Sequence, residues 1–556
     1  MIEKNKTQII FLFMLLFYLL MGLNGIFRMS LTFDELAHIP AGYTYLTEND
    51  YRMNFQDHPP LAKMIAALPL LFFKLLTFKE HRFWRLGYQW QYGDLFLYHN
   101  LVKPYILIHS ARIILLCLSA LLGYIIFLWS RNLGNELAGL IGAGLFYFSP
   151  AFIGHSSLVT TDVPMALCYF LTIFSFWKLY EEIKISNAIM LGLGMGCTLG
   201  VKFSGILIIP VLAFLLFSCL LVGDKKIPWQ EVLIYAGIIF FFATFTLAAI
   251  YRFVHIASYL AGMKYLLTQV GLGRSSFLLG KYSASGWWCY FPITFLLKTP
   301  MGTILLCLVG LGLLPKLCYS NRGRLALLFL TIPATVFLFA AIRSPMQIGH
   351  RHILPIYPFL FTWLGWVSVH FQARLKVLPV ICLSTTLISV LYAQPYNLEY
   401  FNILIGSKNN ASNYLIDSNL DWGQGLKELG KYLQGIDDKQ VFLSYFGTAD
   451  PHYEDIKYIP VLFYSTVHRK VDYPSSLKGK KILFAISATQ KKCLYYASKD
   501  IFQWLNGLKP IGIIAYSIFV YDLTASKTGL QHLQRILRNT GEQKAVALLE
   551  DILKSE

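Results

Sequence analysis

Long apolar runs recur along most of this chain and constrain its fold more than any other feature. They begin near Ile9 and recur until about Ala393, and a helix of roughly 17 to 25 such residues crosses a bilayer. Composition agrees, because 14% of the 556 residues are charged, whereas soluble globular chains carry about a quarter. The sequence therefore predicts a polytopic α-helical membrane protein and excludes an ordinary soluble enzyme.

We expect eleven spans, of which the third and the fifth are short. Their centres lie near Phe17, Leu116, Leu145, Tyr169, Leu193, Leu212, Phe240, Leu305, Val336, Leu360 and Thr386. The short loops on one side carry basic residues, which are Lys4, Lys6, Arg131, Lys178, Lys184, Lys225, Lys226, Lys316, Arg322, Arg324, Arg374 and Lys376. The positive-inside rule makes that side cytoplasmic. The loop 28–104, the segment 251–290 and everything after Ala393 are then expected outside.

Polar residues return after Asn397 and mark a second domain. Short alternating runs at 441–445, 482–486 and 511–521 are typical of strands. Helices are expected through Leu426 to Leu433 and over 530–553. We therefore divide the chain into a transmembrane domain, residues 1–396, and an extracytoplasmic C-terminal α/β domain, residues 397–556.

The outer loop 28–104 carries two short polar motifs. Asp34 and Glu35 come just after the first span, and the second motif is the run 57–63, Asp-His-Pro-Pro-Leu-Ala-Lys. The last residues of this run begin a helix predicted at 61–78, which we expect to lie along the bilayer surface. Ionisable clusters at a membrane boundary commonly mark functional sites. From the residues alone, the alternative is that Asp34 and Glu35 cap a helix or pair with Arg28.

Three further polar segments interrupt apolar runs on the same side. Asp162 begins the fourth span, where it caps the helix or binds a substrate hydroxyl or a divalent metal. Lys202, flanked by apolar residues, either snorkels to the interface or pairs with a phosphate. His350, Arg351 and His352 open the tenth span, and the planar fork of Arg351 suits phosphate oxygens. Anchoring of lipid head groups is the alternative for Arg351.

In this order, the motifs resemble those of the protein O-mannosyltransferases, glycosyltransferase family 39. Their first extracytoplasmic loop also has an Asp-Glu pair before a His-Pro-Pro-Leu-Ala-Lys run, and the glycine-lysine run at Lys202 and the arginine before a Leu-Pro stretch at Arg351 are similar too. The resemblance covers roughly residues 34–358 and extends to the lipid A aminoarabinose transferases. The tail lies outside it, and the sugar-binding repeat module of the eukaryotic members is missing.

This resemblance implies an integral-membrane glycosyltransferase of the C-type fold. The implied reaction is an inverting transfer of a hexosyl or pentosyl group from a polyprenyl-phosphate carrier to a hydroxyl of a protein, lipid A or an envelope glycan. Asp34 is then the catalytic base, and Glu35 orients it or contacts the acceptor. The residues expected to bind the donor phosphate are His58, Lys63, Lys202, Arg351 and His352. Those expected to bind substrate or a divalent metal ion are Asp57, Asp162 and His350.

A transporter or flippase of lipid-linked sugars is the alternative from another class. Transporters commonly show paired halves with interrupted spans, and we find no such symmetry. The net charge of +18 is spread over many loops, which suits contact with anionic lipids and phosphate-bearing substrates rather than nucleic acid. The expected location is the bacterial inner membrane, with the active site on the extracytoplasmic face.

Overall fold

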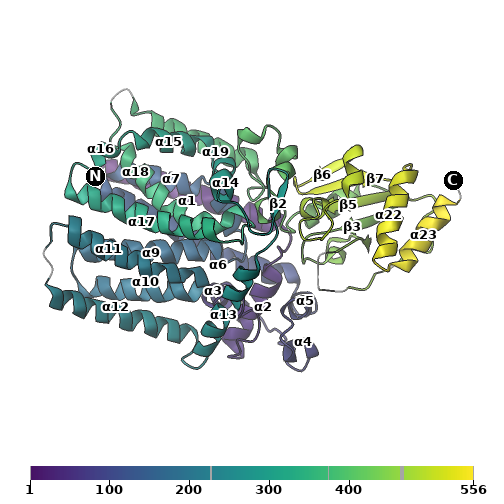
Figure 1. Ribbon diagram of the computed structural model, residues 1–556, viewed down its shortest axis with the longest axis horizontal. Helices are drawn as coiled ribbons and strands as arrows, with labels where there is room; N and C mark the ends of the chain where they lie inside the picture. Colours follow the sequence, from purple (N-terminus) through teal and green to yellow (C-terminus); the bar gives the residue numbers. More distant parts are fainter. Residues whose placement is uncertain are drawn as a thin grey trace.

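The computed structural model describes residues 2–225, 228–372, 375–463, 467, 469–471 and 473–554. A bundle of roughly parallel and antiparallel helices forms one end of the molecule, and a sheet with its helices forms the other (Figure 1). The N-terminus and α16 (Leu314–Leu317) lie at the end of the bundle that is remote from the sheet. Of the basic residues expected in the cytoplasmic loops, Lys226 and Arg374 lie outside the described ranges.

Within these ranges, six helical segments are long and apolar enough to cross a membrane. They are α1 (Ile2–Arg28), α6 (Pro104–Leu133), α9 (Asp162–Glu181), η2 (Phe203–Leu207) continued by α11 (Ile208–Val222), α12 (Trp229–Ile250) and α17 (Asn321–Arg343). Two bent pairs raise the number to eight. They are α7 (Glu136–Tyr147) with α8 (Pro150–Ser156), bent by 59°, and α14 (Tyr290–Lys298) with α15 (Met301–Leu311), bent by 115°.

All eleven predicted centres fall in helices, and six helical segments of the described chain, or eight with the bent pairs, are long and apolar enough to cross a membrane unaided. The remaining centres lie in α10 (Ile185–Val201), α18 (Tyr357–Ser368) and α19 (Leu378–Ala393). These helices have 12 to 17 residues. At about 1.5 Å per residue they are shorter than a hydrocarbon core of about 30 Å.

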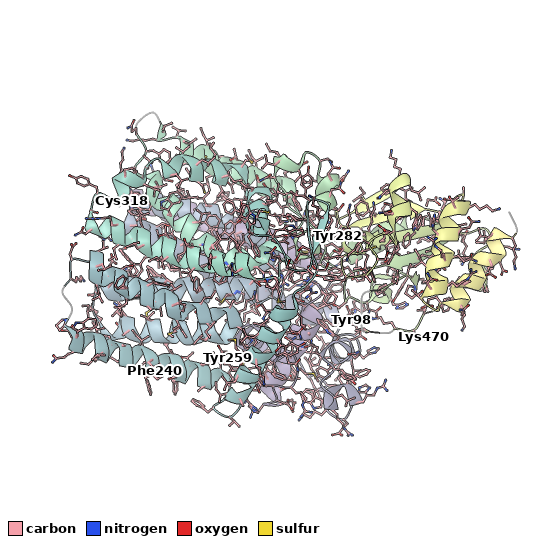
Figure 2. The ribbon with its side chains drawn as sticks, viewed as in Figure 1. Tyr98, Phe240, Tyr259, Tyr282, Cys318 and Lys470 are labelled. Atoms are coloured by element: carbon pink, nitrogen blue, oxygen red, sulfur yellow. The ribbon has the colours of Figure 1, made fainter. Side chains whose placement is uncertain are left out.

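The outer surface of the bundle is apolar, as contact with lipid requires. The side chain of Phe240 on α12 is 68% exposed, and Leu233 and Phe241 on the same helix are also exposed. Figure 2 shows Phe240 at the edge of the bundle. Exposed apolar surface of this extent is unfavourable in water. The chain is a multi-pass membrane protein.

Short elements cover the end of the bundle that faces the sheet. They are α2 (Glu35–Thr47), α3 (Leu61–Ala67), η1 (Leu68–Phe72), α4 (Arg82–Arg85), α5 (Gln89–Tyr98), α13 (Ile256–Leu272), β1 (Ser276–Leu278), β2 (Lys281–Ser283) and η3 (His350–Ile356). The helix expected at 61–78 thus ends at Phe72. Glycines allow close packing here, since a Cβ on Gly93 would lie 2.0 Å from the carbonyl oxygen of Leu36.

The C-terminal part contains a five-stranded sheet in the order β4-β3-β5-β7-β6. Its strands are β3 (Lys439–Ser444), β4 (Tyr458–Pro460), β5 (Lys481–Ser487), β6 (Gly512–Ile514) and β7 (Ile518–Asp522). Strand β3 is parallel to both of its neighbours, and β7 is antiparallel to both of its own. The predicted strand 511–521 is two strands, because Ala515 and Tyr516 turn the chain with positive φ.

Helices α20 (Leu426–Gln434), α21 (Ala488–Lys491), α22 (Lys527–Asn539) and α23 (Gln543–Leu553) accompany the sheet. The helix predicted at 530–553 is therefore two helices, separated by Gly541 with a φ of +80°. The remaining short helices are η5 (Ile403–Ile405), η6 (Lys408–Asn413), η7 (Asp417–Asn419), η8 (Pro451–Glu454) and η9 (Gln503–Gly507). The predicted fold class, a polytopic helical bundle with a C-terminal α/β part, is confirmed.

Backbone hydrogen bonds join the two parts directly behind the first span. The amide of Ser30 donates to the carbonyl of Gln424, and that of Phe33 donates to the carbonyl of Trp422, both over 3.0 Å. The Thr448 hydroxyl donates to the carbonyl of Phe33 over 3.0 Å. Tyr98 and Tyr282 lie at the same junction (Figure 2). The segment 30–33 is thereby held between the bundle and the sheet domain.

Candidate active site

A cavity of about 640 Å³ lies where the bundle meets the C-terminal part. Its walls come from the loop 28–104, the end of α10, α13, η3 and the segments 417–422 and 446–463. Six of the ten predicted site residues line it, namely Asp34, Asp57, His58, Lys202, Arg351 and His352. Glu35, Lys63, Asp162 and His350 are not among its lining residues.

Three charged side chains on the wall of this cavity, those of Asp34, Lys202 and Arg351, form a continuous cluster with the buried Asp162. Arg351 Nη1 lies 3.2 Å from Asp34 Oδ2 and 3.3 Å from Asp162 Oδ2. Lys202 Nζ lies 2.6 Å from Asp162 Oδ1. The cluster holds two carboxylates and two cations, so its formal charge is zero. It joins positions 317 and 189 residues apart in the chain.

Accessibility differs within the cluster. The Asp162 side chain is fully buried, those of Arg351 and Lys202 are 8% and 13% exposed, and that of Asp34 is 23% exposed. A substrate entering the cavity therefore meets the carboxylate of Asp34 more readily than that of Asp162. Lys202 pairs with a carboxylate, so the snorkelling alternative is not what the structure shows.

The backbone aims Asp34 into the cavity. Asp34 stands at the N-cap position of α2, and its side chain makes no capping hydrogen bond. Arg28, the alternative partner, lies 3.7 Å from Glu428 instead. Capping and pairing with Arg28 are therefore both excluded for Asp34, whose carboxylate faces Arg351.

Glu35 lies in the protein core, and its predicted contact with the acceptor is corrected. Its carboxylate accepts hydrogen bonds from Arg112 Nε over 2.8 Å and Arg112 Nη2 over 2.6 Å. The amides of Thr32 and Val159 also donate to it over 2.8 Å. Burial opposes its charge, but Arg112 and the other donors outweigh that effect and hold the pKa of Glu35 below its usual value.

Arg112 was missed at the sequence level, although a signal was present. It stands inside the apolar run that forms α6, and its side chain is completely buried. An arginine at such a position requires a carboxylate partner, since an unpaired buried charge is costly. The Asp-Glu pair offers two carboxylates, and the structure pairs Glu35 with Arg112.

Lys63 and His350 also stabilise structure rather than face the cavity. Lys63 Nζ donates to the carbonyls of Asn54 and His58, each over 2.7 Å. His350 Nε2 lies 2.6 Å from the hydroxyl of Tyr357. The donor-phosphate role predicted for Lys63 and the substrate or metal role predicted for His350 therefore lack a contact with the cavity.

Three polar atoms at the cavity have hydrogen-bonding capacity that no described residue uses. They are Arg351 Nε, His352 Nε2 and His58 Nδ1, all buried. Buried polar atoms are nearly always satisfied in native structures. Burial, followed by the nearby charge of Lys202, lowers the pKa of both histidines well below the usual value. Neutral imidazoles and a guanidinium thus surround the space beside Asp34.

The C-terminal part supplies cavity residues that the sequence did not single out for function. The ring of Trp422 covers the Arg351 guanidinium, with 4.3 Å between the guanidinium carbon and the ring centroid. Asp417 also lines the cavity and has a φ of +56°. Both residues make contacts with segments far away in the chain, which no local sequence pattern indicates.

The donor set does not fit a divalent metal. Throughout the described ranges, no group of three His, Cys, Asp or Glu side chains lies close enough to hold one. Asp162 is engaged by Lys202 and Arg351. Asp57 Oδ2 accepts from Asn54 Nδ2 over 2.7 Å. The chemistry derived below therefore uses hydrogen bonds and fixed charges alone.

Comparison with known proteins finds one family model that matches part of the chain. The model of the family described as dolichyl-phosphate-mannose-protein mannosyltransferase matches residues 107–251. No curated protein matches. The structure resembles ArnT from Cupriavidus metallidurans bound to undecaprenyl phosphate, at 12% identity and a TM-score of 0.48, covering 93% of this chain and 98% of that one.

Two other solved structures are also similar. The S. cerevisiae Pmt1-Pmt2 complex bound to the sugar donor matches at 19% identity and a TM-score of 0.34, covering 46% of this chain and 34% of that one. Archaeal oligosaccharyltransferase AglB from Archaeoglobus fulgidus matches at 11% identity and a TM-score of 0.46, covering 78% of this chain and 62% of that one. Over residues 107–251 the chain is thus similar to the dolichyl-phosphate-mannose-protein mannosyltransferases, as its motifs predicted, and this similarity indicates a membrane glycosyltransferase.

Proposed function

We propose that the protein is an inverting glycosyltransferase acting on the outer face of the bacterial inner membrane. It moves a hexosyl or pentosyl group from a polyprenyl-phosphate carrier to the hydroxyl of a protein, lipid A or an envelope glycan. One observation carries this proposal. The carboxylate of Asp34 and the cations of Lys202 and Arg351 share one wall of a single cavity.

These groups match the charges that develop during glycosyl transfer. The acceptor oxygen forms a bond with the anomeric carbon, the bond from that carbon to the phosphate oxygen breaks, and its electron pair stays on the phosphate. Asp34 takes the acceptor proton as general base. Lys202 and Arg351 stabilise the charge on the departing phosphate. Attack opposite the leaving group inverts the anomeric centre.

Donor binding would also release the base. Arg351 holds Asp34 at 3.2 Å when the cluster is neutral. A donor phosphate brings negative charge that competes with Asp34 for the same guanidinium, and bidentate contact with phosphate is a strong interaction for arginine. Asp162, fully buried, keeps Lys202 and Arg351 on one side of the cavity. Asp162 is therefore a positioning residue.

Helix α13 offers a route for the isoprenoid chain. Leu266 and Tyr265 of α13 line the cavity, while Leu260 and Leu267 on the same helix are exposed. An apolar chain that leaves the cavity along this helix would pass directly into the surrounding lipid.

The proposal is tested with purified full-length protein and undecaprenyl-phosphate carriers bearing labelled mannose, glucose or aminoarabinose. Transfer of label from the carrier to an acceptor supports it, whereas label that crosses a vesicle membrane on its carrier supports a flippase. Asp34→Asn should lower turnover by at least about a hundredfold and leave binding of undecaprenyl phosphate intact. Asp50→Asn is the matched control, since Asp50 pairs with Arg52 near the surface. Near-normal turnover of Asp34→Asn would refute the assigned base.

A further inference from the structure

A second cavity adjoins the active-site cavity at the start of α5 and the residues that precede it. Its volume is about 230 Å³. Asn54, Gln56, Gln89 and Trp90 line both cavities, so the two are adjacent and share these residues as a wall; together we call them the groove, and the second cavity its extension. A small molecule at Asp34 would leave this extension unused. The groove is longer than transfer to a lone hydroxyl requires.

Apart from Arg52, the side chains along the extension are amides and aromatic rings. Gln56 and Gln89 contribute amides, and Tyr88 and Trp90 contribute rings, to the same short stretch of wall. The amide of Gln89 also bonds within the protein, since its oxygen accepts from Asn54 over 2.8 Å and its nitrogen donates to Asp57 over 3.1 Å. Primary amides both donate and accept hydrogen bonds, which matches the paired donor and acceptor character of sugar hydroxyls. Aromatic faces suit the C–H faces of pyranose rings, because they are apolar yet carry polar edges.

An aromatic wall connects the extension to the catalytic cluster. Trp90 meets Phe33 edge to face, with 5.1 Å between the ring centroids. Phe33 in turn stacks on Phe446 of the C-terminal part, at 5.4 Å and 25°. All three line the main cavity, and Phe33 precedes Asp34 directly. A ring bound against this wall would place a hydroxyl near the proposed base.

The described walls of the two cavities offer no exposed sheet edge to which an extended peptide could add a strand. Peptides commonly bind by adding a strand to a sheet edge through main-chain hydrogen bonds. Among the described residues, no strand residue lines either cavity. The groove therefore favours recognition through hydroxyls and ring faces over recognition through a peptide backbone.

We propose that the acceptor is a carbohydrate chain of at least two sugar units. Its reacting sugar lies against Phe33, Phe446 and Trp90 beside Asp34, and the next unit occupies the extension at Gln56, Tyr88 and Gln89. The inference deepens the proposed function and rests on it, because it names the acceptor class of the same site. The C-terminal part then takes part in acceptor recognition through Phe446.

The test is direct binding of fluorescently labelled, full-length protein to an array that carries defined oligosaccharides and serine- or threonine-containing peptides. We expect oligosaccharide binding that weakens about tenfold or more in Trp90→Ala, equivalent to about 1.4 kcal/mol, and is partly restored in Trp90→Phe. Trp229→Ala is the matched control, since Trp229 is 66% exposed at the start of α12. Retained binding of undecaprenyl phosphate shows that each variant is folded.

The outcomes separate the two proposals. Trp90-dependent binding of peptides, or oligosaccharide binding that Trp90→Ala leaves unchanged, would overturn the inference. Absence of oligosaccharide binding by folded wild-type protein would overturn it as well. Trp90-dependent oligosaccharide binding without sugar transfer from any of the undecaprenyl-phosphate donors would instead refute the proposed function and leave the groove as a carbohydrate site.

Discussion

Replacing Glu35 by glutamine tests whether the second residue of the Asp-Glu pair is structural. The change keeps the shape of the side chain but removes the charge that neutralises Arg112. Both side chains of this pair are completely buried. Removal of one partner from a buried ion pair costs about 3–5 kcal/mol, because the remaining charge stays desolvated. Arg112 keeps three hydrogen bonds to the carbonyls of Ile26, Met29 and Ser30, so we expect about 3 kcal/mol.

The effect also has a defined pH dependence. Burial raises the pKa of Glu35, but Arg112 and the hydrogen-bond donors lower it further, so the folded value lies below the ordinary 4.5. The contribution of the pair to stability is therefore complete above about pH 4.5 and is lost as the pH falls through the folded-state pKa. Denaturant titrations in detergent over a series of pH values should show a large deficit of Glu35→Gln at pH 7 that shrinks as the pH falls through the folded-state pKa of Glu35.

Comparison with the neighbouring carboxylate completes the test. Glu35→Gln should retain turnover per folded molecule within about tenfold, while Asp34→Asn should lose turnover and keep the wild-type unfolding free energy. Addition of Arg112→Met to Glu35→Gln should recover part of the lost stability, since residues in contact are not additive. Wild-type stability combined with a collapse of turnover in Glu35→Gln would refute the structural role of Glu35.

Four further outcomes are expected. Lys202→Met should weaken binding of undecaprenyl phosphate about tenfold and Lys202→Arg should restore it in part, whereas equal affinities in a flotation assay would contradict a phosphate contact. Burial raises the pKa of Glu399 to about 7, so stability falls as the pH rises from about 4.5 to 7. Glu399→Gln should abolish that slope, worth about 3 kcal/mol, in denaturant titrations across the range, and an unchanged slope would assign it to another group. Arg469→Met should break the ion pairs of Arg469 with Asp94 and Asp450. The C-terminal part should then be cleaved faster by protease after residue 397, and an unchanged cleavage rate would contradict this expectation. EDTA should leave the transfer rate unaltered, since no three candidate ligands among the described residues lie close enough to hold a metal ion. A loss of activity that added cation restores would show that a metal is needed.

The helices could be predicted because their apolar runs are long, but their geometry could not be read from hydropathy. The two bends fall at Pro150 and Pro300, and proline interrupts helical hydrogen bonding. Hydropathy averages across such a break and counts a straight span. The short helix α18 is buried along nearly its whole length by neighbouring helices, whereas α10 and α19 each expose apolar side chains such as Met190 and Ile388. That difference is a property of packing and not of composition.

The sequence predicted the residues of the charged cluster but not which of them form ion pairs with one another. Asp34, Asp162, Lys202 and Arg351 were all named from their motifs. In the structure Asp34 pairs with Arg351, and Asp162 joins Arg351 to Lys202. Adjacent residues at a helix start point about 100° apart, so only one carboxylate of an Asp-Glu pair can face the cavity. Which one does so depends on the buried Arg112, a tertiary partner that the local sequence does not contain.

The backbone hydrogen bonds between segments 30–33 and 422–424 join two parts of the chain that are synthesised at different times. The loop with the proposed base emerges from the ribosome early, and segment 422–424, which holds it in place, emerges hundreds of residues later. An exchange of domains between related proteins should therefore give a working protein only when both segments, 30–33 and 422–424, come from the same parent. A chain shortened before residue 397 would be an enzyme with an unanchored base, not a smaller working one.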